Sequence, residues 1–236
     1  NNLSPAGIAM DVNKGPLEKA QEHIREEKLG GKIATRLGNG LAPLEPGETD
    51  TVIIAGMGGD LICKILKAKP EFLIEGKEFI LQPQSEWFKI RRLLKEYRYQ
   101  IEKEWFLKED GKYYVIIKAE PAWTQPQRLK HQQPSIHEYI KEISDTQVNQ
   151  AVSEKDMESI YEQYGKYLIE TKNPVLKEYL EKEIVKKESI AAELKLSIKE
   201  MESEELSGKE RGNIAKRQRR YQEIQKEIRD MRKAIG

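Results

Sequence analysis

The chain lacks several features that mark particular classes of protein. Its 236 residues include one cysteine, three histidines and no run of about 18 apolar residues. One cysteine cannot form an internal disulfide, which fits a reducing compartment, and scattered histidines argue against a zinc or iron site. The missing apolar run argues against a membrane-spanning helix, and residues 1–5 lack the basic and apolar regions of a signal peptide. We therefore expect a cytoplasmic protein with no metal and no membrane partner.

The chain also has little net charge and few reactive side chains. Forty-one Lys and Arg oppose 40 Asp and Glu, so any surface for nucleic acid must be local. Cys63 lies between apolar residues of a predicted helix, without His or Asp at a catalytic spacing. A buried structural thiol is therefore favoured over a nucleophile.

Strand and helix patterns alternate over residues 1 to about 120. Short β-branched or apolar runs at 8–11, 32–37, 51–55 and 79–81 predict strands, and amphipathic stretches between them predict helices. Two further strands, 99–107 and 113–119, flank Asp110-Gly111, a strong hairpin-turn signal. This order predicts an α/β fold, a doubly wound parallel sheet that ends in an antiparallel pair.

Unusual residues follow four of these strands directly: Asp11, Asn39 with Gly40, Gly56 to Gly59, and Gln82-Pro83. Ligands of doubly wound sheets bind outside the carboxyl ends of the strands, so we expect these turns to meet at one edge. The Asp11 carboxylate could accept hydrogen bonds from a ribose diol, or it could simply stabilise a turn. The Asn39 side chain could bind an adenine edge, or it too could simply stabilise a turn. The glycine-rich turn leaves room for a ligand, although chance also produces such spacings.

The second half of the chain contains almost no strand signal. Prolines and glutamines in residues 121–156 indicate a linker or insertion, with a short possible helix around 136–143. After Asn173-Pro174, two apolar stripes at heptad spacing predict an antiparallel coiled-coil hairpin. The first stripe is interrupted only at Lys187. We therefore expect three regions: a sheet domain at 1–120, the linker at 121–156, and a helical domain at 157–236.

The second arm of this hairpin is strongly basic. Ten Lys and Arg oppose four Glu and Asp between Lys209 and Gly236. Such a face fits phosphate contacts or an ordinary solvated helix, and composition alone leaves both open. The candidate contact residues are Lys216, Arg217, Arg219, Arg220, Lys226 and Arg229.

Several motifs together resemble bacterial tRNA (adenine-N1)-methyltransferases that act at position 22, the TrmK family. The resemblance rests on these segments: Ile8 to Val12 with Gly15-Pro16-Leu17, Arg36 to Leu41, Asp50 to Gly59, Leu81-Gln82-Pro83, and Glu109 to Tyr114. The Ala-Gly-Met-Gly-Gly turn with Leu-Gln-Pro is its most specific part. The resemblance covers the sheet domain and extends, more loosely, through the helical hairpin.

This resemblance implies a Rossmann-like class I methyltransferase sheet and S-adenosylmethionine as the cofactor. By resemblance, Asp11 with Val12 would hold the ribose, Asn39-Gly40 the adenine edge, and Ala55 to Gly59 the methionine end and the target base. Gly56, Met57 and Gly58 would form the catalytic turn, and the basic arm would hold tRNA. The rival interpretation is a noncatalytic RNA-binding or scaffold protein that works through the hairpin alone.

The resemblance also implies a difference at the start of the chain. The family carries its first strand, with an acidic glycine-containing cofactor loop, upstream of the position of Ile8. That strand is central in the methyltransferase fold, so without it the sheet would have a gap and exposed strand edges. We expect either that the molecule continues before Asn1 or that it does not bind the cofactor normally.

Overall fold

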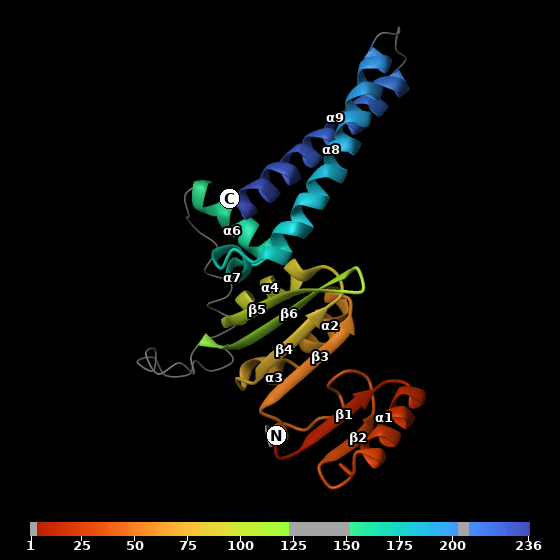
Figure 1. Ribbon diagram of the computed structural model, residues 1–236, viewed down its shortest axis with the longest axis vertical. Coiled ribbons are helices and arrows are strands. Elements are labelled where there is room, and N and C mark those ends of the chain that lie inside the picture. Colours follow the sequence, from red (N-terminus) through yellow and green to blue (C-terminus); the bar gives the residue numbers. More distant parts are fainter. Residues whose placement is uncertain (1–3, 123–151, 203–207) are drawn as a thin grey trace. The chain divides into compact units, whose positions relative to one another are not determined.

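The computed structural model describes residues 4–122, 152–202 and 208–236 (Figure 1). The chain forms two compact units, one from residues 1–102 and 117–146, the other from residues 103–116 and 147–236. The helix expected around residues 136–143 lies outside the described residues.

The first unit begins with a two-stranded parallel sheet. Strand β1, Gly7–Asp11, pairs with β2, Ile33–Leu37, so that Asp11 lies opposite Leu37. Helix α1, Lys14–Glu26, connects them and buries Leu17. A strand, a helix and a second parallel strand form the predicted crossover unit, so the pattern in this segment is confirmed.

A four-stranded mixed sheet follows, in the order β3-β4-β6-β5. Its strands are β3 Thr51–Met57, β4 Glu78–Pro83, β5 Tyr99–Glu109 and β6 Lys112–Pro121. β3 and β4 are parallel, and β6 runs antiparallel to β4. The predicted α/β alternation and the terminal hairpin are therefore confirmed.

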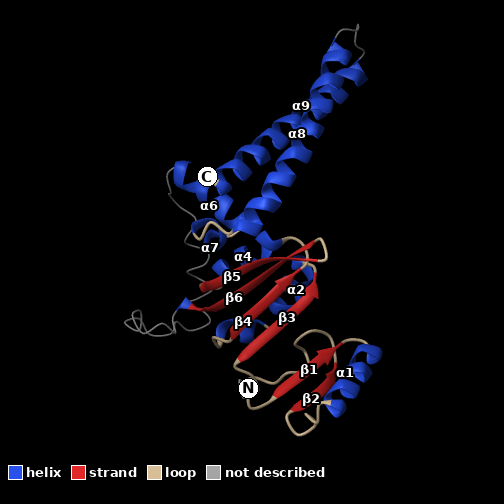
Figure 2. Ribbon diagram, viewed as in Figure 1, coloured by secondary structure: helices blue, strands red, loops and turns tan. Residues whose placement is uncertain are grey.

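Three helices belong to this sheet: α2 Gly59–Ala68, α3 Pro70–Ile74 and α4 Trp87–Glu96 (Figure 2). Alternate residues of β3 and β4 are buried, which makes one face of the sheet the core. The core side chains are Val52, Ile54, Phe79, Leu81, Ile62, Leu66, Ile90 and Leu94. The short helix α3 was missed by the sequence pattern, because five residues carry too little periodicity to recognise.

The second unit is built from helices α6 Val152–Tyr164, α7 Lys166–Glu170, α8 Pro174–Glu202 and α9 Gly208–Ile235. Asn173 starts α8, since its Oδ1 accepts hydrogen bonds from the backbone N–H groups of Val175 and Leu176, both at 3.0 Å. Pro174 occupies the first helical position, where its missing N–H is harmless.

Helices α8 and α9 are antiparallel. Arg232 of α9 pairs with Glu188 of α8 at 2.5 Å, while Arg217, earlier in α9, contacts Ser197, later in α8. The predicted stripes face inward, with these members buried: Leu180, Ile184, Ala191, Ile214, Ile224, Ile228 and Met231. Lys187, which interrupts the first stripe, forms an ion pair with Glu227 of α9. A charged residue is tolerated in this stripe because its partner lies on the facing helix.

The tip of the β5–β6 hairpin belongs to the helical unit. The Phe106 ring lies 5.5 Å from the Tyr179 ring of α8, and the Tyr113 and Tyr179 rings are 5.0 Å apart. Glu178 accepts hydrogen bonds from Lys108, Lys182 and Tyr113 at 2.6 to 3.1 Å, which lowers its pKa to about 2. The sequence pattern groups the whole hairpin with the sheet, because it contains no sign of these contacts with Tyr179.

Candidate cofactor site and nucleic-acid surface

The turns after β1 and β2 are joined to each other. The backbone N–H of Gly38 donates to the carbonyl oxygen of Asp11 at 3.0 Å. The Asp11 carboxylate accepts a hydrogen bond from the N–H of Asn13 at 2.7 Å through Oδ1, which is a turn interaction. Its Oδ2 has no hydrogen-bond partner among the described residues, and the neighbouring Val12 is 60% exposed. The turn therefore orients the carboxylate while one oxygen remains available.

Asn39 and Gly40 form the turn after β2. Gly40 has a φ of 56°, and a Cβ there would lie 2.8 Å from Cγ2 of Ile65 in α2. Glycine is therefore required both by the left-handed backbone and by the close approach to α2. Asn39 is exposed, and its backbone carbonyl accepts from Ala42 at 3.1 Å. Its side chain has no hydrogen bond within the described part of the chain.

The Gly56 turn ends β3 with an irregular register between Ala55 and Met57. Gly56 has a φ of 80°, and no atom lies within 4 Å of where its Cβ would be. Its N–H donates to Oε1 of Gln82 at 2.8 Å. The turn thus combines a backbone held in the left-handed region with open space above it.

The loop after β4 holds the other end of this turn. The N–H of Gln84 donates to the carbonyl of Met57 at 2.8 Å, and the N–H of Gly59 donates to the carbonyl of Ser85 at 3.0 Å. A Cβ on Gly59 would lie 2.7 Å from the carbonyl oxygens of Ser85 and Glu86, a distance that backbone atoms do not tolerate. The side chain of Gln82 and the glycine at 59 are site features whose roles the sequence did not reveal.

Charged residues beside the turn are paired with one another. Asp60 contacts Lys64 at 2.8 Å and Lys89 at 2.9 Å, and these ammonium groups lower its pKa to about 2. Glu86 contacts Lys89 at 2.6 Å, and that hydrogen bond lowers the Glu86 pKa. Neither carboxylate is therefore suited to act as a general base near neutral pH.

The four turns come together as two pairs. Asp11 and Gly38 connect the first pair, and Gly56 and Gln82 connect the second. Gly40 of the first pair lies against Ile65 of α2, the helix that follows the Gly56 turn. Burial raises the pKa of the half-buried Cys63 thiol, which agrees with a structural role. Within the described ranges no cluster of three His, Cys, Asp or Glu side chains could hold a metal ion.

The candidate nucleic-acid surface lies on α9, where all six predicted residues are exposed. Arg217 contacts Ser197 Oγ at 2.5 Å, and Arg220 contacts Glu223 at 3.2 Å and Glu227 at 3.4 Å. The other four have no ion-pair or hydrogen-bond partner in the portion of the chain that the structure describes: Lys216, Arg219, Lys226 and Arg229. Their charges are therefore available to a ligand.

These unpartnered cations face away from the helix α8. Arg219 lies five residues from each of the buried Ile214 and Ile224, which is a rotation of about 140° around the helix. Lys226 follows Arg219 by seven residues, two helical turns, and lies on the same side. Arg219 and Lys226 thus lie together on the outer face of α9, without partners among the described residues.

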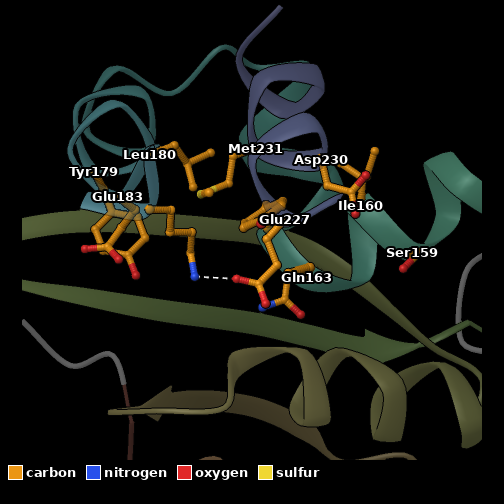
Figure 3. A pocket seen from close by; sticks show the side chains of 11 residues that line it. Ser159, Ile160, Gln163, Tyr179, Leu180, Glu183, Glu227, Asp230 and Met231 are labelled. Atoms are coloured by element: carbon orange, nitrogen blue, oxygen red, sulfur yellow. Dashed lines mark hydrogen bonds and ion pairs between the residues drawn. The ribbon is translucent and has the colours of Figure 1, made fainter. Parts of the chain in front are cut away.

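A cavity of about 360 Å³ lies within the helical unit, between α6, α8 and α9 (Figure 3). Its walls include Tyr164 and Tyr179, three carboxylates (Glu183, Glu227 and Asp230), and Lys187, which is paired with Glu227. Burial raises the pKa values of both tyrosines, so they stay neutral. The excess of negative charge does not suit a phosphate group, so the cavity is no candidate for nucleic-acid contact.

None of the described helices is both long enough and apolar enough to cross a membrane.

Comparison with known proteins identifies the family. The family model for TrmK, tRNA (adenine(22)-N(1))-methyltransferase, matches residues 1–162. The chain belongs to this family. A curated relative, the tRNA (adenine(22)-N(1))-methyltransferase of Bacillus subtilis strain 168, is 32% identical over 181 residues, covering 63% of this chain and 75% of the relative.

Solved structures show the same fold. The crystal structure of the B. subtilis m1A22 tRNA methyltransferase TrmK matches with a TM-score of 0.66 and 24% identity, covering 98% of this chain and 82% of that one. The M. capricolum TrmK, solved with S-adenosyl-homocysteine, matches with a TM-score of 0.62 and 22% identity, covering 98% and 80%. The expected Rossmann-like methyltransferase fold is confirmed.

Proposed function

We propose that this chain uses the strand-end turns of its sheet unit to bind S-adenosylmethionine and transfers the methyl group to N1 of adenine 22 in tRNA. The observation that carries the proposal is the match of the TrmK family model to residues 1–162, the part of the chain that contains all four turns. A relative from Streptococcus pneumoniae was solved in complex with S-adenosyl-L-methionine. The chain is a tRNA (adenine-N1)-methyltransferase that depends on this cofactor.

We assign the cofactor contacts as the family resemblance implies. Asp11, with Val12 beside it, binds the ribose diol, and the free Oδ2 supports this role because a diol needs an acceptor that the turn does not consume. Asn39 and Gly40 bind the adenine edge, for which the Asn39 amide is exposed. The Ala55 to Gly59 turn receives the methionine end and the target base, supported by the open space at Gly56.

The chemistry requires alignment more than proton transfer. Adenine N1 carries a lone pair and no proton, so it would form a bond to the methyl carbon without a general base. The bond from that carbon to sulfur would break, which leaves the neutral thioether of S-adenosylhomocysteine and moves the positive charge to the methylated adenine. This suits a turn beside which two carboxylates, Asp60 and Glu86, are held in ion pairs. N1 lies on the Watson-Crick edge, so a paired or stacked adenine must first be extruded.

We propose further that α8 and α9 form a coiled-coil arm, in a domain beginning near residue 157, and that α9 binds tRNA phosphates. Heptad spacing, the buried stripes and the four unpartnered cations support this role. The linker expected at residues 121–156, between this domain and the sheet domain at 1–120, lies mostly outside the described residues, and its last five residues belong to α6. A tRNA substrate also fits the cytoplasmic location expected from the single cysteine.

We propose that the family's first strand, which precedes the position of Ile8, lies between β1 and β3 in the sheet. Among the described residues, β1 pairs with β2 and β3 with β4, and each has one edge without a strand partner. Ile53 of β3 is 68% exposed, although its β-branched side chain is typical of a buried strand. Both observations support a place for that strand at this position.

A noncatalytic RNA-binding or scaffold protein is not favoured. Such a protein would work through the α8–α9 arm, whereas the family model covers the sheet unit and ends at residue 162, before α8 begins.

A matched pair of glycine variants tests the cofactor site in the full-length protein. Gly56 and Gly47 have nearly equal φ angles of 80° and 83°, and neither has an atom within 4 Å of its Cβ position. Gly56→Ala and Gly47→Ala therefore carry the same backbone strain, of about 1–2 kcal/mol. Only Gly56→Ala should weaken binding of S-adenosylhomocysteine in calorimetry and slow transfer of labelled methyl groups to tRNA.

Equal effects of the two variants on ligand binding would show that the Gly56 turn is not the cofactor site. A full-length wild-type protein that binds tRNA but transfers no methyl group would establish the noncatalytic alternative instead.

A further inference from the structure

Gln82 is a polar side chain at the candidate site, and it is not among the residues assigned to the cofactor. It lies near the end of β4, directly opposite Ala55 of β3. Its Oε1 accepts the N–H of Gly56 at 2.8 Å, whereas its Nε2 is buried and has no hydrogen-bond partner in the described residues. One half of the amide is thus used and the other half is left unsatisfied.

The unsatisfied half makes a purely stabilising role unsuitable for Gln82. A buried donor without a partner opposes folding, and this penalty offsets the gain from the single hydrogen bond that Oε1 makes. An apolar side chain of the same length would avoid the penalty, and the N–H of Gly56, which is exposed, could then donate to solvent. Among the described residues the amide therefore adds little net stability, which points to another role.

Its contribution is visible in the backbone that it contacts. The ladder between β3 and β4 shifts register between Ala55 and Met57, and Gly56 at this shift has a φ of 80°. A residue at such an irregularity is left without a ladder partner, so its N–H must find another acceptor. Gln82 supplies that acceptor from its side chain.

The other anchors of the turn are backbone atoms. Met57 is held by the N–H of Gln84, and Gly59 is held by the carbonyl of Ser85. Gly56 differs from both, since its N–H is held by a side chain that one substitution can remove while the two backbone bonds remain.

We propose that Gln82 is a positioning residue for methyl transfer, acting through Gly56 to fix the turn that receives the methionine end of the cofactor and the target adenine. This inference rests on the proposed function of the turn. Methyl transfer requires N1, the methyl carbon and sulfur to lie in line, and a displacement of about 1 Å can lower the rate about 100-fold. If the turn were released at Gly56, this alignment would be lost, while the affinity for tRNA would be unchanged.

The test compares Gln82→Met, which has nearly the same shape without an acceptor, with Gln82→Glu, which keeps an oxygen for the Gly56 N–H. Gln100→Met is the matched control, since Gln100 is exposed on β5 of the same sheet. For Gln82→Met in the full-length enzyme, we expect kcat to fall about 10- to 100-fold, with unchanged tRNA affinity and a thermal midpoint equal to or above that of the wild type. Gln82→Glu should recover a substantial part of kcat, and Gln100→Met should match the wild type.

Hydrogen exchange at the Gly56 amide provides a readout that does not depend on activity. The Gly56 N–H should exchange faster in Gln82→Met than in the wild type and should be protected again in Gln82→Glu. Faster exchange with unchanged kcat would overturn the positioning role while leaving the proposed function intact. A loss of kcat that parallels a lower thermal midpoint, or that Gln82→Glu does not recover, would also overturn it. An inactive wild type would instead refute the proposed function.

Discussion

Neutralising two free cations on α9 should change the salt dependence of tRNA binding by a predictable amount. Arg219 and Lys226 are exposed, unpartnered in the described residues, and two helical turns apart on the outer face. Each phosphate contact contributes about 0.9 to the slope of log affinity against log salt. Arg219→Gln with Lys226→Gln should therefore lower that slope by about 1.8 units.

This slope change corresponds to a measurable difference in affinity. Between 50 and 200 mM salt, the double variant should lose about 12-fold less affinity than the wild type, because a fourfold change in salt is raised to the power of about 1.8. Fluorescence anisotropy with labelled tRNA, over a salt series, measures the slope directly. S-adenosylhomocysteine binding, measured by calorimetry, should stay unchanged.

Lys195→Gln with Lys199→Gln is the matched control, since both lysines are exposed on α8 and unpartnered in the described residues. It removes the same charge from the facing helix and should leave the slope unchanged. Equal slope changes in the two double variants would refute a specific phosphate-binding face on α9. Unchanged slopes in both would show that the tRNA surface lies elsewhere.

Three further predictions follow from individual contacts. Asp11→Asn keeps an oxygen for the Asn13 N–H but removes the carboxylate, so calorimetry should show S-adenosylhomocysteine binding weakened by about 1.5–3 kcal/mol with tRNA affinity unchanged. Phe106→Ala should lower the free energy of unfolding by about 3–5 kcal/mol in denaturant titrations, because Phe106 is 2% exposed and packs on Tyr179; a loss below 1 kcal/mol would contradict that packing. The pKa of Glu178 is lowered to about 2, so its ion pairs stabilise the fold above pH 4.5 and are lost as the pH falls toward 2; Glu178→Gln should show a smaller drop in thermal midpoint over this range than the wild type.

The sequence by itself predicted the order of the strands and of the helices α1, α2, α4, α8 and α9, but not the short helices α3 and α7 or the helix α6. Period-two and period-3.6 patterns and turn residues such as Asp110-Gly111 are local, so they can be read without knowing what packs against them. The stripes of α8 and α9 could be predicted for the same reason, since heptad spacing requires a partner helix. The motifs at the strand ends also sufficed to indicate the family.

Only the tertiary structure decided which of those residues are available and what holds them. The sequence of α9 does not reveal which of its ten cations are paired. Only packing shows that Arg220 contacts Glu223 and Glu227, while Arg219 has no partner in the part of the chain that the structure describes. The Gly56 to Gln82 hydrogen bond spans 26 residues and arises from strand register, which no local pattern specifies. The hairpin tip belongs with the helices because Phe106 and Tyr113 meet Tyr179, a contact between segments about 70 residues apart. Long-range contacts of this kind depend on how the elements pack, and a one-dimensional pattern does not contain that information.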